Sequence, residues 1–342
     1  MGARLRAWLW LAALGLACGL LPMSPALAAD PCPLLRAQQS APDAATRIAA
    51  AACEEHQAWH RPFIDVDGRL AGSVVREAES ALLANGQPAW QRVADYWRGS
   101  GLLGQVMQRT GAVDCASTAA PQSAPGCRSF ILDTPWSAAF VSWVMRRAAL
   151  PGFGASASHV DYVRAAYRDP ESSAYRIADP RAGRPSRGDL LCYVRVPGRN
   201  FGFGGLATLL SSEGGGLGMH CDVVVGAGEG GDRTARLVGG NVLDGVTMRL
   251  LPLTAGGHFA DLPTRLESGA ACSPDAPAAC NANRQDWAAL LQLRPQAELA
   301  RLAPPPPLQG PAAAPVSPQC CVHCVVGSGV PRCPAGALPQ GR

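Results

Sequence analysis

Residues 134–144 read TPWSAAFVSWV and form the best-specified helix start of this 342-residue sequence. Thr134 is a good N-cap residue, and Pro135 suits the first helical position because an N–H there would have no partner within the helix. The apolar residues that follow recur at helical spacing, so one face of the segment is expected to be buried. The sequence therefore predicts a helix from Pro135 to about Leu150, with Ser137 in its first turn.

The segments around this helix change from helical to strand patterns along the chain. Helical signals cover residues 43–59, 73–83, 88–97 and 158–167, and strand patterns cover residues 190–194, 220–225, 236–238 and 246–251. Helices first and strands second favour an α+β fold with helices packed on an antiparallel sheet. A Gly-rich loop, residues 197–219, joins the first two strands, and a loop of this length is usually functional or disordered.

The N-terminus has the features of a signal peptide. Arg4 and Arg6 precede an apolar run over residues 7–21, and the small residues PALAA at 25–29 are typical of a cleavage site. The run is short for a membrane span, and no later stretch approaches the ~20 apolar residues that a spanning helix needs. We expect cleavage near residue 29 and export to the periplasm or beyond, without a transmembrane anchor. An uncleaved anchor is the alternative.

The cysteine content supports export. Of 13 cysteines, all but Cys18 lie in the mature chain, and the resulting even number in an oxidising compartment indicates disulfides. Closeness in sequence suggests pairing of Cys32 with Cys53, Cys115 with Cys127, and Cys272 with Cys280, although sequence alone does not fix connectivity.

Metal binding is a weaker interpretation of two other clusters. The tail contains Cys320, Cys321, His323, Cys324 and Cys333. These residues lack the paired C-x-x-C spacing of zinc sites, so disulfides are preferred. His56 and His60 are four residues apart, but no third ligand is evident. We expect neither a metal nor a cofactor.

Charge and composition exclude one class of partner and divide the chain. The net charge is only +4, and the 30 basic residues, all arginine, are scattered, so no nucleic-acid surface is predicted. We expect a signal peptide at 1–29, an N-terminal helical segment at 30–70 and a main domain at 71–265. An extension with a Pro- and Ala-rich linker follows at 266–318, and a Cys-rich tail at 319–342.

Residues 135–144 resemble the nucleophile helix of the CHAP and NlpC types of papain-like cell-wall amidase, where the motif reads Trp-Cys-Ala-Ala-Phe-Val. The strand entry at 185–193, with its Gly188-Asp189, and the strand that opens at His220 follow in the same order as in those enzymes. The span from about 70 to 255 is more closely similar to the bacterial domain-of-unknown-function family 2272. Its typical phrases are present here as WQRVADYW at 90–97, PWSAAF at 135–140, GDLLCY at 188–193 and HCD at 220–222.

The resemblance to the amidases implies a papain-like fold and a catalytic set for amide hydrolysis. The nucleophile position falls on Ser137, the base on His220, and the polar residue that orients the base on Asn241, at the end of the next strand. A cell-wall peptide is the implied substrate, which makes a peptidoglycan amidase or endopeptidase the implied activity. Trp136, His159 and Tyr162 are expected to bind it, the last two because they lie three apart on a helix; ordinary packing is the alternative.

Ser137 departs from the family pattern at the nucleophile. A helix dipole stabilises a cysteine thiolate, but a hydroxyl is far less acidic and must lose its proton to an aligned base during attack. Two interpretations therefore stay open: a serine hydrolase, or a catalytically inactive module that binds cell-wall peptide. A relocated nucleophilic cysteine is a third, but Cys221 points to the opposite strand face from His220. Both Cys221 and Cys192 are expected to be buried or disulfide-bonded.

Overall fold

The computed structural model describes residues 30–72, 75–118, 121–212, 215–266, 268, 270–305, 307, 323–324 and 331–332. The predicted signal peptide and most of the predicted Cys-rich tail lie outside the described residues. None of the helices within these ranges has the length and the apolar character that a membrane crossing needs.

Helices dominate the first half of the described chain and strands the second. The α-helices are α2 (Cys32–Leu35), α3 (Ala44–Ala58), α4 (Ala89–Gly99), α5 (Ala124–Asp133), α6 (Ser137–Arg147), α7 (His159–Arg168), α8 (Gly202–Ser211) and α9 (Gln296–Leu299). The strands are β1 (Phe63–Ile64), β2 (Leu70–Ala71), β3 (Tyr175–Ala178), β4 (Leu190–Val194), β5 (Met219–Ala227), β6 (Thr234–Val242), β7 (Gly245–Pro252) and β8 (Asp286–Leu293), with β9 (His323–Cys324) and β10 (Pro331–Arg332) as a separate pair.

Eight strands form one sheet in the order β2-β1-β7-β6-β5-β4-β8-β3. All neighbours pair antiparallel except β1 and β7, which are parallel. The α+β prediction is therefore confirmed, while the sheet is mixed rather than purely antiparallel. Strand β1, which makes the parallel pair, lies in the N-terminal segment 30–70, and this segment was predicted to be helical only.

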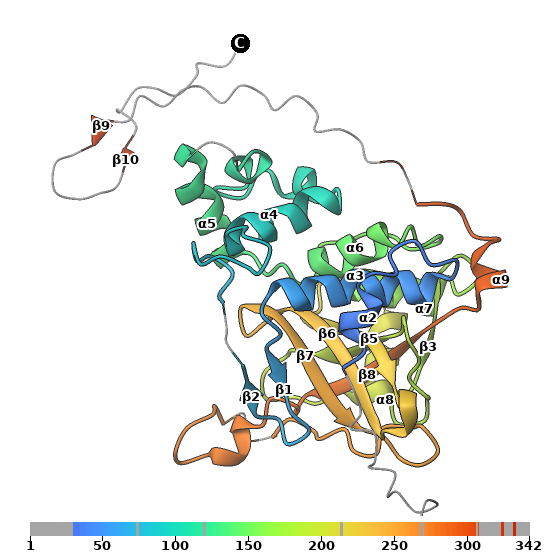
Figure 1. Ribbon diagram of the computed structural model, residues 1–342. Helices are drawn as coiled ribbons and strands as arrows, with labels where there is room; N and C mark the ends of the chain where they lie inside the picture. Colours follow the sequence, from blue (N-terminus) through green and yellow to red (C-terminus); the bar gives the residue numbers. More distant parts are fainter. Residues whose placement is uncertain are drawn as a thin grey trace, which may run out of the picture.

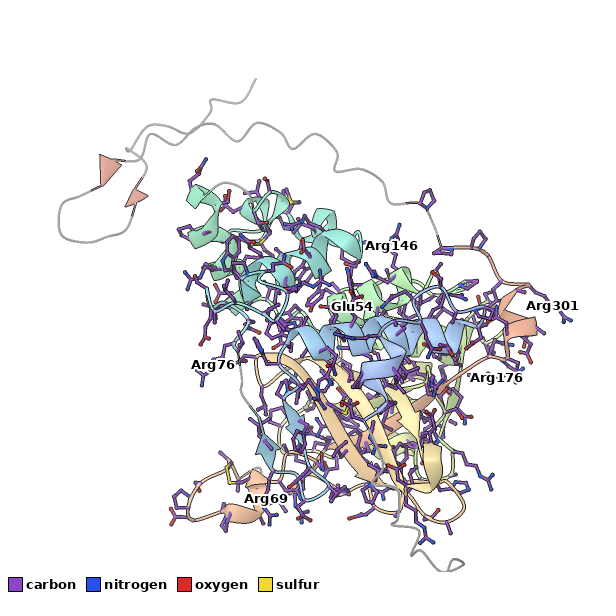
Figure 2. All side chains as sticks on the ribbon, in the orientation of Figure 1. Glu54, Arg69, Arg76, Arg146, Arg176 and Arg301 are labelled. Atoms are coloured by element: carbon purple, nitrogen blue, oxygen red, sulfur yellow. A yellow bond between two sulfur atoms is a disulfide. The ribbon has the colours of Figure 1, made fainter. Side chains whose placement is uncertain are left out.

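Helices α3, α6 and α7 lie against one face of this sheet (Figure 1). Residues 137–145 of α6 are all buried, because the helix lies between the sheet and helices α3 and α4. Tyr96 of α4 fills the centre of this layer, with its ring 5.4 Å from Trp136 and 5.3 Å from Phe140. Glu54 of α3, labelled in Figure 2, forms an ion pair of 3.1 Å with Arg147 of α6.

The other face of the sheet is also buried. A second apolar cluster there contains Leu191 and Tyr193 of β4, Val224 of β5, Leu237 of β6 and Trp287 of β8. Burial on both faces explains why β4 and β5 read as nearly continuous apolar runs rather than alternating ones. Polar groups within these strands therefore need partners inside the protein.

Three elements differ from the sequence-based expectations. The predicted helix at 73–83 is wrong, since residues 75–83 form turns and an isolated bridge from Leu82 to Pro88. The Gly-rich loop contains α8, whose first N–H groups, on Phe201 and Gly202, both donate to the Asp286 carboxylate at 2.8 Å. Strand β8 lies between β4 and β3, although residues 266–318 were predicted as an extension.

Four disulfides connect the described residues. Cys32–Cys53, Cys115–Cys127 and Cys272–Cys280 are the three predicted pairs, and Cys192–Cys221 is a fourth. The fourth joins directly opposed residues of β4 and β5. Cys192 and Cys221 are thus buried and oxidised, as expected, and neither is available as a nucleophile.

Candidate functional site

Ser137 is the first residue of α6. The N-cap is Trp136, without a side-chain cap, whereas Thr134 ends α5, so the expected N-cap role of Thr134 is wrong. The difference arises because the preceding helix extends to Asp133 and leaves only three residues between the two helices. Ser137 therefore lies beside the unpaired N–H groups of the first helical turn, although its side chain is only 4% exposed.

The Ser137 hydroxyl contacts a histidine from the next helix. His159 begins α7, and its Nε2 lies 2.7 Å from Ser137 Oγ. Tyr162, one turn further along α7, binds the other ring nitrogen, Nδ1, through its hydroxyl. Burial, followed by the neighbouring His220, holds the pKa of His159 well below its usual range, so this imidazole is neutral at physiological pH.

His220 forms a second polar group with Asp222, two residues along β5. His220 Nε2 lies 2.7 Å from Asp222 Oδ1, and Arg249 Nε of β7 donates to Asp222 Oδ2 at 3.0 Å. Burial alone would raise the pKa of Asp222, but His220 and Arg249 outweigh it and hold this pKa well below the usual range. Asp222 is therefore a buried carboxylate that fixes the orientation of the His220 ring.

The two groups meet through their histidines. The ring centroids of His159 and His220 are 5.2 Å apart, and Tyr193 covers His220 with a centroid separation of 5.1 Å. Burial lowers the pKa of His220, although Asp222 opposes this shift. The Nδ1 atom of His220 is buried without a hydrogen-bond partner among the described residues. This nitrogen is therefore an open hydrogen-bonding position within the polar cluster.

A glycine on the neighbouring strand makes room for the Asp222 carboxylate. A Cβ atom at Gly239 of β6 would lie 1.9 Å from Asp222 Oδ1, which is too close for any side chain. The first glycine of the Gly239-Gly240-Asn241 motif thus leaves the space that the Asp222 carboxylate occupies next to His220. Gly240 makes room on the other face, where its Cβ would meet Phe140 of α6 at 2.4 Å.

Asn241 contacts the start of α6 rather than His220. With its amide nitrogen toward Glu77 Oε2 (3.0 Å), its oxygen accepts from the Trp136 backbone N–H (3.2 Å). Trp136 Nε1 donates to the same Glu77 oxygen at 2.6 Å. Asn241 has a positive φ of 56° at the bulge near the end of β6, a conformation that asparagine tolerates better than most residues. Glu77, Trp136 and Asn241 therefore form a clamp on the peptide that precedes Ser137.

The clamp predicts a pH-dependent stability. Burial, helped by nearby Asp244 and opposed by the Trp136 hydrogen bond, raises the pKa of Glu77 to about 7. A raised carboxyl pKa contributes stability that is complete below the unfolded-state value and is lost as the pH rises through 7. We expect Glu77→Gln to reduce the loss of unfolding free energy between pH 5.5 and 8.5 by about 1–2 kcal/mol, after allowance for solvent screening.

Urea titrations of the native protein and the variant at both pH values measure this difference. Glu79→Gln is the matched control, because Glu79 is exposed two residues further on. An identical pH slope in the native protein and in Glu77→Gln would mean that Glu77 does not titrate in this range.

The structure thus divides the predicted site residues. It joins Ser137 with His159 and Tyr162, places His220 beside this group, and separates Asn241 into the clamp. Trp136 is fully buried and stacks between Trp59 and Tyr96, so its indole packs in the core. Asp222 was not predicted as a site residue, although the strand alternation that excluded Cys221 also places Asp222 on the same strand face as His220.

Other candidate sites are either small or dispersed. The described residues contain no group of three or more metal-binding side chains. His56 and His60 each contact a different backbone carbonyl, those of Pro62 and Leu82. A cavity of about 160 Å³ lies between Asp43, Asp189 and Leu293, and it is lined by neither Ser137 nor His220.

Ser137 at a helix start, two neutral imidazoles and a buried carboxylate form one buried polar cluster in an α+β fold. The model of a family described as uncharacterised proteins conserved in bacteria, the domain-of-unknown-function family 2272, matches residues 84–293. The chain belongs to this family, as the sequence motifs indicated. Neither a curated protein nor a solved structure shows detectable similarity to it.

Proposed function

We propose that the chain is an exported serine hydrolase with a papain-like site, which cleaves an amide bond in cell-wall peptide. The proposal keeps Ser137 as the nucleophile and His220 as its base, and it assigns Asp222 instead of Asn241 as the residue that orients the base. Four disulfides favour an oxidising compartment and hence export.

The hydrogen bonds of His159 and His220 support the assignment of Ser137 as the nucleophile and His220 as the base. Asp222 only accepts, so His220 Nε2 carries the proton and Nδ1 presents a lone pair. The Tyr162 hydroxyl has His159 Nδ1 as its acceptor, so His159 Nε2–H donates to Ser137 Oγ. This assignment leaves the Ser137 O–H proton without a described acceptor and His220 Nδ1 without a donor. The first is a hydrogen-bond donor and the second an acceptor, which is the relation that a nucleophile and its base require.

The reaction then follows from these positions. When substrate binds, the Ser137 hydroxyl transfers its proton to His220 Nδ1 as its oxygen attacks the amide carbonyl. The Asp222 carboxylate stabilises the resulting imidazolium, which an asparagine could not do as well. Backbone N–H groups at the start of α6 are available for the developing oxyanion. His220 then donates its proton to the leaving amine, and the acyl group stays on Ser137 as an ester. A water molecule, with His220 again as the base, hydrolyses this ester to release the acid and restore the Ser137 hydroxyl.

Purified peptidoglycan tests the proposal. The native protein is expected to release soluble peptides or new amino groups, and Ser137→Ala is expected to reduce this rate to the background. Ser142→Ala is the matched control, because Ser142 lies in the same helix and, among the described residues, its hydroxyl bonds only to the backbone of Ser156. Equal rates for the native protein and Ser137→Ala would contradict Ser137 as the nucleophile.

A binding module without activity is the second candidate function. Its support is the burial of the site, since Ser137 is 4% exposed and His220 is fully buried. In that case the native protein sediments with insoluble peptidoglycan and releases nothing from it. Digestion that requires Ser137 would exclude this candidate.

A further inference from the structure

Arg195 lies immediately beyond the end of β4, beside the strand that carries His220. Its N–H donates to the carbonyl of Gly218 at 2.7 Å, which continues the pairing of Tyr193 with His220 and of Val194 with Met219. Side chains alternate along a strand, so Arg195 leaves the chain on the same face as Tyr193, whose ring covers His220. The residue opposite Arg195 is a glycine, so the partner strand provides no side chain to cover it.

Among the residues that the structure describes, the guanidinium of Arg195 has no acidic partner. Arg195 is exposed, and no ion pair or side-chain hydrogen bond connects it to another described residue. Its charge nevertheless reaches the site. After burial and the effect of His220, Arg195 further lowers the pKa of His159, and it also contributes to the lowered pKa of His220. A positive charge without an acidic partner in the described part of the chain therefore lies at the solvent-facing edge of the buried histidines.

The backbone on both sides of this arginine is held in place. Arg265 donates from Nη1 to the carbonyl of Val196 at 2.7 Å and from Nη2 to the carbonyl of Val194. Asn200 in turn donates to the carbonyl of Arg265 at 3.0 Å. A cation on a fixed backbone loses less entropy when it binds an anion than one on a mobile loop. The guanidinium of Arg265 is thus hydrogen-bonded to backbone carbonyls, whereas the guanidinium of Arg195 is available to bind a ligand.

We propose that Arg195 binds a carboxylate of the substrate, so that the chain acts on acidic peptides whose carboxylate lies close to the bond that is cleaved. This inference rests on the proposed function and adds a substrate class to it. A guanidinium binds a carboxylate through two parallel hydrogen bonds, which fixes the orientation of the ligand as well as its charge. Arg195 would accordingly align an acidic peptide across the edge of β4 and β5, beside His220.

The probe is a preparation of soluble stem peptides from purified peptidoglycan, used with free carboxylates and after conversion of these to primary amides with carbodiimide and ammonia. We expect the native protein to favour the free acids in kcat/KM by about 10- to 100-fold, as a charge-assisted hydrogen bond implies. Arg195→Gln should remove this preference, mainly through KM. Mass spectrometry of the products shows whether the recognised carboxylate is terminal or on a side chain.

Arg199→Gln is the matched control, because Arg199 is exposed four residues further on and its guanidinium stacks on Phe201. This variant should keep the preference for free acids. An unchanged preference in Arg195→Gln, or an equal loss in both variants, would overturn the inference while leaving the hydrolase proposal intact.

Calorimetric titration of the same two peptide preparations separates failure of this inference from failure of the proposed function. If the native protein hydrolyses nothing but binds the free acids in an Arg195-dependent way, the hydrolase proposal fails and the carboxylate site stands. If the native protein neither binds nor cleaves the free acids more readily than the amides, the carboxylate site is wrong.

Discussion

We expect a His220→Gln variant to lose at least about a thousandfold in kcat on cell-wall peptide, whereas His159→Gln loses only about tenfold. Glutamine can still donate to Asp222 at position 220, so the buried carboxylate keeps a partner and the fold is retained. What disappears is the basic lone pair of Nδ1. At position 159 a glutamine can still donate to Ser137 Oγ, so only the alignment of the hydroxyl suffers.

Rates measured for both variants against pH decide between the two histidines. The native profile should fall in acid as His220 becomes protonated, below the usual imidazole range because burial lowers the pKa of this residue. His159→Gln should keep that acid limb and His220→Gln should lose it. The opposite ranking, with His159→Gln inactive and His220→Gln active, would make His159 the base, since it is the imidazole in direct contact with Ser137.

The regular elements could be predicted where local pattern and burial agree. Helix α6 and strands β4 to β7 were each placed within a few residues, because their apolar residues lie close to glycine or proline. Strand β8 was missed because its single apolar run, at 287–291, follows a segment with weak local signals. Its place between β4 and β3 depends on contacts across more than 90 residues of sequence, which no local pattern records.

The site was predictable in its residue types but not in all of its contacts. Ser137 and His220 came from motif order, and His159 and Tyr162 from their spacing on one helix. Asn241 was predicted to orient His220. In the structure its φ is positive, and its amide contacts Trp136 and Glu77 instead. The role of Glu77 could not be foreseen either, since its segment was predicted as a helix and instead returns to the β6–β7 turn, where the Glu77 N–H donates to the Asp244 carbonyl at 2.7 Å.

A cysteine at position 137 should become a reactive thiol if the site retains the environment of the cysteine amidases that it resembles. The start of α6 and a nearby imidazole both favour a thiolate, while burial of the side chain opposes it. We expect the first two effects to prevail and the thiol pKa to fall below its ordinary value. At neutral pH the Ser137→Cys variant would then react with iodoacetamide about ten times faster than an ordinary thiol.

Ser142→Cys is the control that separates these effects. Ser142 is fully buried in the middle of the same helix, where its hydroxyl contacts the backbone of Ser156 and no imidazole. A thiol there is buried without a helix terminus or a histidine, so its pKa should rise and it should react slowly. The label must be mapped to its residue by peptide mass spectrometry, because the chain has 13 native cysteines.

The same experiment distinguishes a working serine enzyme from one that has lost its activity. An inert native protein combined with a fast thiol in Ser137→Cys would mean that the histidines still favour a thiolate and that the serine alone prevents catalysis. Removal of His220 from this variant should slow labelling, because the imidazolium that pairs with the thiolate is gone. If the thiol at position 137 reacts no faster than the one at position 142, with or without His220, then residues 137 and 220 do not act together. The hydrogen bond between His159 and Ser137 is in that case only a structural contact at the start of α6.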